Sequence, residues 1–335
     1  MDTYFFDRLT YQKYYNCNAY NIEQVPFKDR RNILIGSVYI GLFFVFEILY
    51  FPCIMAIYRR INQSCYKIMF FMGIVDVLCL PIVGLLHGYL GVIGAVFCTT
   101  PDLIYITGCV SMGLWACEGM AATLLAVDRC LEIAMPKLGN VMFNGNLTWL
   151  WLSIPTIYGT CFGFFGKPVL FSSIEMAWFL DPHYGYLPNT STWYHSDVHI
   201  FNNSFIMFVL TSLYVTFAVL LWYKSWSYMS LSGDRTPSTL MRSQRMSFLQ
   251  VLILSVVHVN ASGVYCYMQY FNVGSFVTHM AMFGWFLAHG IPPVIYLALN
   301  KSIRNDCIQM FKRIFKIRAN TIKTTVTSVN VNVKV

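Results

Sequence analysis

Charged residues are scarce in this sequence: Asp, Glu, Lys and Arg make up 11% of its 335 residues, whereas apolar residues make up 57%. A soluble domain carries about 25% charged residues, so this composition cannot cover a water-facing surface. The net charge of +8 does not indicate a nucleic-acid partner, because the basic residues fall between and after the apolar segments. The composition therefore excludes a soluble domain and predicts an integral membrane protein.

Motifs for metal binding and for hydrolysis are absent from the sequence. None of the 11 cysteines forms a CxxC pair, and most lie inside apolar segments, where Cys behaves as a small apolar residue. There is no HExxH or GxSxG motif, so we expect neither an enzyme nor a cofactor. The first eight residues include Asp2, Asp7 and Arg8 and no apolar run, so we expect no cleavable signal peptide.

Seven apolar stretches are each long enough to cross the bilayer as a helix, which takes about 20 residues. The sequence therefore predicts an all-α membrane protein, a seven-transmembrane helix bundle embedded in the lipid bilayer of the plasma membrane. The seven stretches cover residues 33–58, 68–94, 101–134, 147–166, 200–223, 248–271 and 275–300.

The distribution of basic residues predicts the orientation of this bundle. The connections after the first, third and fifth helices, together with the C-terminal tail, hold 17 of the 23 Lys and Arg residues, and the other side holds six. The positive-inside rule therefore places the N-terminus outside and the C-terminus in the cytosol. The expected organisation is an extracellular N-terminal segment (1–32), the bundle (33–300), an amphipathic juxtamembrane helix (301–318) and a disordered tail (319–335).

The segments outside the bundle carry three further signals. The long fourth connection contains a glycosylation sequon at Asn189, on the predicted outer side. Cys17 and Cys98 are the only cysteines predicted outside, which makes them a candidate disulfide pair. Apolar residues recur at helical spacing from Ile303 to Ile314 with basic residues opposite, the pattern of a helix on an anionic leaflet. An ordinary solvated tail is the alternative.

The third helix ends in an adjacent acid and base, Asp128 and Arg129. An Arg at the mouth of a helix bundle is costly unless it is paired, and the neighbouring carboxylate can pair with it. Such a pair can act as a latch that opens when Asp128 is protonated or when Arg129 gains a new partner. The alternative is a charge pair that only sets topology.

This pair and its surroundings resemble rhodopsin-like receptors. The Asp-Arg pair followed by Pro136 resembles their Asp-Arg-Tyr motif, with Cys130 in place of the Tyr. Pro293 to Tyr296 resembles the end of their Asn-Pro-x-x-Tyr motif, with Pro292 in place of the Asn. The resemblance implies a switch that couples to a heterotrimeric G protein, formed by Asp128, Arg129, Pro136, Pro293 and Tyr296.

Ionisable residues recur at one depth of the predicted bundle. Counted at about 1.5 Å per residue, they lie near the bilayer midplane, where such groups are rare and face the interior. We hypothesise one buried polar layer that binds a cation or shares protons; separate residues hydrogen-bonded to nearby backbone are the alternative. The resemblance implies a sodium site near Asp76 and Glu118. The five residues of the layer are Glu47, Asp76, Glu118, His258 and His289.

The outer half of the bundle is where a small ligand would enter, through a site lined by aromatic and small polar side chains. By its spacing from Arg129, Ser111 occupies the place where amine receptors carry an Asp, which argues against a biogenic amine. Each candidate can also be an ordinary packing residue. The candidates are Ser111, Met112, Trp115, Asn203, Phe205, Tyr265, Gln269 and His279.

Two departures from the rhodopsin-like pattern indicate a more specific family. The fourth connection has no Cys, so the usual bridge from the third helix cannot form, and the sixth helix has no Pro. With the Tyr-Asn-Cys sequence at 15–17 and the His-Gly-Ile-Pro-Pro-Val-Ile-Tyr-Leu run at 289–297, these departures resemble the nematode serpentine receptors of class T. The resemblance covers about residues 15–318. It implies a chemosensory receptor for an unknown small-molecule ligand, in the plasma membrane of sensory-neuron cilia.

Two other classes of membrane protein are the alternatives. A secondary transporter would show inverted repeats, and the sequence has no internal repeat. A seven-helix ligand-gated channel of the insect odorant type would have its N-terminus inside, against the charge distribution.

Overall fold

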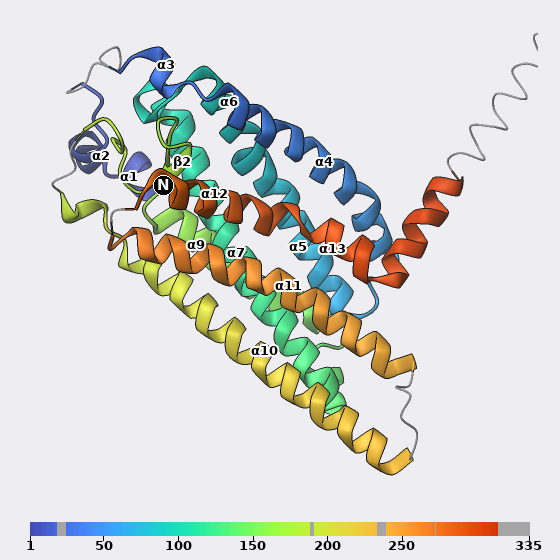
Figure 1. The fold of residues 1–335 in the computed structure, drawn as a ribbon. Helices are drawn as coiled ribbons and strands as arrows, with labels where there is room; N and C mark the ends of the chain where they lie inside the picture. Colours follow the sequence, from blue (N-terminus) through green and yellow to red (C-terminus); the bar gives the residue numbers. More distant parts are fainter. Residues whose placement is uncertain (19–24, 188–190, 233–238, 272, 314–335) are drawn as a thin grey trace, which may run out of the picture.

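The computed structural model describes residues 1–18, 25–187, 191–232, 239–271 and 273–313 of the chain. The predicted glycosylation site Asn189 and the predicted tail, 319–335, lie outside the described residues. The described part is almost entirely helical, and its long helices run side by side as a bundle (Figure 1). These helices are α4 (Ile33–Tyr58), α5 (Ser64–Leu80), η2 (Pro81–Leu86), α6 (His87–Ile93), α7 (Pro101–Ala134), α9 (Leu147–Phe165), α10 (Asp197–Ser232), α11 (Thr239–Met268), α12 (Ser275–Gly290) and α13 (Pro292–Leu299).

Short elements connect the long helices or cover their ends. They are α1 (Asp2–Phe5), α2 (Arg8–Tyr14), α3 (Phe27–Arg30), η3 (Phe97–Thr99), α8 (Pro136–Met142), the antiparallel strands β1 (Leu170–Ser172) and β2 (Ala177–Phe179), and η4 (Thr192–Tyr194).

By length and composition alone, five helices of the described part can span a membrane, or six if the bent pair α12 and α13 is one span. The remaining long helix, α9, contains two Trp, one Tyr, three Thr and one Pro, which lower its hydropathy. It nevertheless packs closely against α7, because Gly113, Gly159 and Gly163 face one another. A Cβ at Gly159 would lie 2.5 Å from the Gly113 carbonyl oxygen, so small residues permit this approach.

One of the predicted spans is broken in the structure, and another changes its helix type along its length. The second span is α-helical up to Leu80 and then continues through one π-helical segment, η2, which begins at Pro81. The last span bends by 54° between α12 and α13, where Pro292 and Pro293 follow each other. Proline has no N–H to donate to the preceding turn, which explains a change of helix geometry at each of these positions.

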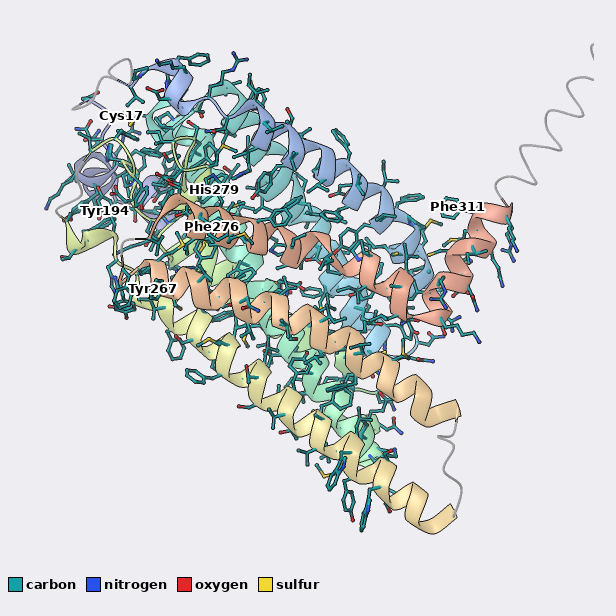
Figure 2. The ribbon with its side chains drawn as sticks, viewed as in Figure 1. Cys17, Tyr194, Tyr267, Phe276, His279 and Phe311 are labelled. Atoms are coloured by element: carbon teal, nitrogen blue, oxygen red, sulfur yellow. A yellow bond between two sulfur atoms is a disulfide. The ribbon has the colours of Figure 1, made fainter. Side chains whose placement is uncertain are left out.

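The end of the bundle that carries the N-terminus, here called the N-terminal end, is covered by folded segments. The sulfur atoms of Cys17 and Cys98 form a disulfide, with 5.4 Å between the Cα atoms. The hairpin of β1 and β2, which the sequence did not predict, lies in the fourth connection and is fully buried. Figure 2 shows Cys17 and Tyr194 at this end, and Phe311 at the opposite end.

Residues 301–313 are helical and lie at the opposite end of the bundle. Ile303, Cys307 and Met310 are buried there against the bundle, whereas Phe311 is exposed. The predicted apolar face therefore packs largely on the protein itself. Asp306 also forms an ion pair of 2.9 Å with Arg60, in the connection between α4 and α5, and this pair fixes the helix further.

Candidate functional site

The break before α13 supplies the first polar contact of the site. Because Pro293 has no N–H, the carbonyl oxygen of His289 four residues earlier lacks its helical partner. The hydroxyl of Tyr50, on α4, donates to this oxygen at 2.8 Å. The local sequence thus creates a free carbonyl, and a neighbouring helix satisfies it.

Asp76 on α5 completes a buried polar triad with the same two residues. The Tyr50 hydroxyl also lies 2.7 Å from Asp76 Oδ2, so its one hydrogen is shared between two acceptors, and His289 Nδ1 lies 2.8 Å from Asp76 Oδ1. All three side chains are almost completely inaccessible to solvent. The triad therefore ties α4, α5 and α12 together near the middle of the bundle.

A second buried pair lies on α7 and α11. The carboxylate of Glu118 is 4.0 Å from His258 Nε2, and both side chains are inaccessible. Neither Glu118 oxygen, nor His258 Nδ1, has a hydrogen-bond partner within the described part of the chain. The two groups are thus closely placed, but their hydrogen-bonding capacity is not met within the described residues.

Trp115 lies between the two polar groups. Its ring stacks on His258 with 5.3 Å between ring centroids, and meets His289 edge-on at 5.9 Å. One aromatic side chain on α7 is therefore in contact with both histidines of the predicted layer.

Four of the five residues of the predicted layer form two close pairs. Among the described residues Glu47 makes no hydrogen bond or ion pair with either pair; it is half-buried on α4, and its Oε1 has no hydrogen-bond partner there. In the described part of the chain, no group of three or more His, Cys, Asp or Glu side chains is arranged to hold a metal ion. The contacts found are one hydrogen-bonded pair, Asp76 with His289, and one facing pair, Glu118 with His258.

A small cavity lies directly above Trp115, toward the N-terminal end. Its volume is about 10 Å³, close to the least that holds one water molecule. Three aromatic side chains, two apolar ones and two neutral polar ones enclose it. The lining residues are Met112, Trp115, Val169, His199, Asn203, Tyr265 and Trp285.

Four of the eight candidates for the ligand pocket line this cavity: Met112, Trp115, Asn203 and Tyr265. Gln269 does not line it but lies 2.7 Å from His199 Nδ1, which does. Sequence reasoning missed Val169, His199 and Trp285. Val169 belongs to the fourth connection, whose fold the sequence did not reveal, whereas His199 and Trp285 carried a readable signal as polar or aromatic residues near Asn203 and His289.

The other three candidates lie outside the cavity. Ser111 is buried, but its hydroxyl donates to the carbonyl of Gly108 on its own helix. Phe205 is 38% exposed and faces away from the bundle. His279 is partly exposed at the N-terminal end, where its Nδ1 lies 2.5 Å from the Ser275 carbonyl oxygen (Figure 2).

At the opposite end, the closest partner of Arg129 is not the adjacent acid. Its guanidinium lies 2.5 Å from Glu132 and 3.9 Å from Asp128. Residues three apart lie on one face of a helix, whereas adjacent residues point in different directions, so Glu132 is better placed. Pro136 begins α8 just beyond, and Tyr296 is buried on α13.

Comparison with known proteins identifies relatives over nearly the full length. Residues 1–321 match the family model described as serpentine type 7TM GPCR chemoreceptor Srt. The chain is 25% identical over 309 residues to Serpentine receptor class T-55 of Caenorhabditis elegans, which covers 89% of this chain and 80% of the relative.

Proposed function

Because the chain belongs to the Srt family of serpentine 7TM chemoreceptors, which are multi-pass membrane receptors, we propose that it binds a small molecule in the cavity above Trp115. Binding would activate a heterotrimeric G protein at the opposite end of the bundle. The observation that carries this proposal is the position of Trp115, which lines the cavity and also stacks on His258. A ligand that moves this ring acts directly on the buried polar pairs.

The proposal includes an orientation with the N-terminal end outside the plasma membrane. The excess of basic residues in the connections and tail at the opposite end supports it. The test is glycosylation at Asn189, read as a gel shift that is lost in Asn189→Gln, together with protection of a C-terminal epitope in intact cells. An unglycosylated Asn189 with an accessible tail would fit the odorant-gated channel class instead.

Coupling to the G protein is assigned to Arg129 and its partners. In this structure the Glu132 carboxylate engages the Arg129 guanidinium, which favours a closed state of this end. Release of this pair would leave the guanidinium free for the G protein. Exposed pairs of this kind contribute about 0.3–0.5 kcal/mol, so one substitution can shift the balance of states.

The experiment measures ligand-free nucleotide exchange on purified G proteins by the receptor and its variants. Glu132→Gln is expected to raise exchange, whereas Arg129→Ala is expected to abolish it at equal surface expression. Arg59→Ala is the matched control, because Arg59 is exposed at the same end and its pairing is not part of the proposed switch. Unchanged exchange in Arg129→Ala would contradict the proposal.

A further inference from the structure

One side of the cavity is a connected set of polar groups. The Trp115 indole donates to Asn203 Oδ1 at 2.9 Å, and Asn203 Nδ2 lies 3.3 Å from His199 Nε2. The other ring nitrogen, His199 Nδ1, lies 2.7 Å from Gln269 Nε2. A neutral imidazole has one acceptor nitrogen, so His199 can accept a hydrogen bond from only one of these two amide groups. The connected contacts hold this side of the cavity in place.

Trp285, which also lines the cavity, carries an unmet donor. Trp285 is 3% exposed, and its Nε1 has no hydrogen-bond partner in the part of the chain that the structure describes. An indole N–H can only donate, so it requires an acceptor oxygen or nitrogen. Beside it, the Tyr265 hydroxyl has a weak partner, the sulfur of Met282 at 3.7 Å. A bound molecule with an acceptor would satisfy a group that the protein leaves unsatisfied.

No formal charge faces the cavity. None of its seven lining residues is Asp, Glu, Lys or Arg. Lys167, two residues before Val169, has its Nζ bonded to the carbonyl oxygens of Trp193 and His195. A charged ligand would therefore be buried without a counter-charge, which is strongly unfavourable.

The size of the cavity limits the ligand as well. Pockets for drug-sized ligands measure about 300–1,000 Å³, far more than the 10 Å³ found here. A ligand must displace side chains, and Met112 is suited to this because its unbranched chain has three rotatable bonds. Tyr265 is also weakly held. The cavity thus opens toward Met112, Tyr265 and Trp285, and only far enough for a small molecule.

We infer that the ligand is a small uncharged molecule with an apolar body and one hydrogen-bond acceptor, such as a carbonyl oxygen. The acceptor pairs with the Trp285 indole, and the body lies among Met112, Trp115 and Tyr265. This inference rests on the proposed function and adds the chemical class of its ligand. Trp285 is accordingly the residue that selects acceptor-bearing molecules.

Four probes of nearly equal shape test the ligand class. Acetophenone has the carbonyl acceptor, isopropylbenzene lacks it, benzoate replaces it with an anion, and 1-phenylethylammonium replaces it with a cation. Binding is measured by equilibrium dialysis against the purified full-length chain in lipid nanodiscs, with empty nanodiscs as the blank. Acetophenone is expected to bind at least about fivefold more tightly than isopropylbenzene, the effect of about one hydrogen bond, and more tightly still than both ions. Equal binding of all four, preference for either ion, or no binding of acetophenone would overturn the inference.

Two variants test the place of binding. Trp285→Phe removes the donor while keeping an aromatic ring, and it is expected to abolish the preference for acetophenone over isopropylbenzene. Met112→Phe fills the cavity and should weaken the binding of both acetophenone and isopropylbenzene. Val110→Phe is the matched control and should leave both unchanged, because Val110 lies on the same helix and is 38% exposed. Thermal unfolding of each variant without probe shows that it is folded. An acetophenone preference that persists in a folded Trp285→Phe variant would refute the role of the indole.

These binding measurements require no G protein, so they separate this inference from the proposed function. If acetophenone binds as expected but exchange does not depend on Arg129, the ligand class stands and the coupling proposal fails. If exchange depends on Arg129 but the four probes show no preference, the ligand class fails and the receptor proposal stands.

Discussion

Replacing Asp76 by alanine removes the centre of the triad that joins three helices. Its two carboxylate oxygens lie 2.7 Å from the Tyr50 hydroxyl and 2.8 Å from His289 Nδ1. Tyr50 keeps a second acceptor, the His289 carbonyl oxygen at 2.8 Å, so the imidazole nitrogen suffers the main loss. Side-chain hydrogen bonds between membrane helices average about 0.6 kcal/mol and reach about 1.7, and a buried group left unpaired costs about 1–3 kcal/mol. We expect Asp76→Ala to lower the free energy of unfolding by about 2–3 kcal/mol.

Asp76→Asn distinguishes lost hydrogen bonding from lost charge. The amide retains an oxygen for Tyr50 and offers a nitrogen to His289, so the expected cost is about 1 kcal/mol or less. Unfolding is followed by SDS titration of the purified chain in mixed micelles. Leu78→Ala is the control, because Leu78 is on the same helix and 57% exposed, and such a change costs about 0.5 kcal/mol or less.

A double-mutant cycle identifies the partner. If His289 is the group left unpaired, Asp76→Ala in a His289→Ala background should cost markedly less than in the wild type. Two results would refute the reasoning: an Asp76→Ala variant as stable as Leu78→Ala, or a cycle with no interaction energy between Asp76 and His289.

Three further predictions concern the covering segments and the helix contacts. Cys17→Ser and Cys98→Ser should each lower the free energy of unfolding by about 2–4 kcal/mol, and the double variant no further, in the same SDS titration. Gly108→Ala should cost about 2–3 kcal/mol, because its Cβ would lie 1.8 Å from a backbone oxygen, whereas Gly41→Ala, with nothing within 4 Å, should be neutral. Burial lowers the pKa of His183, so protonation favours the unfolded state; stability should be full above about pH 6.5 and fall below it, and His183→Gln should flatten this dependence in thermal unfolding at graded pH. A flat profile in the wild type would contradict the last expectation.

Helix positions could be predicted from the sequence because they depend on local properties. Apolar length alone predicts a helix over residues 33–58 and another over 101–134, and the structure has helices with these bounds, α4 and α7. The β1–β2 hairpin could not be predicted in the same way. Its residues are buried against helices far away in the sequence, so its fold depends on contacts that no local pattern records.

In the candidate site, the sequence predicts how deep a side chain lies in the bundle but not which neighbour it faces. Counting residues gives the depth of a side chain but not which way it points around its helix. The structure therefore joins Asp76 to His289 by a hydrogen bond, whereas Glu47, at a similar depth, makes none with either among the described residues. One error was avoidable: Asn203 and Phe205 are two residues apart, which is about 200° around a helix, so both could not face one cavity.

The double proline at the start of α13 has a mechanical consequence. Two successive nitrogens that cannot donate leave the joint between α12 and α13 without two of the bonds that stiffen a continuous helix. Bending at this joint therefore breaks few backbone hydrogen bonds, and what resists it is the side chain of Tyr50, which holds the freed carbonyl oxygen. The stiffness of the last span is thus set by a neighbouring helix. Replacing Tyr50 by phenylalanine would remove the hydroxyl that holds the carbonyl oxygen, and the joint would bend more easily.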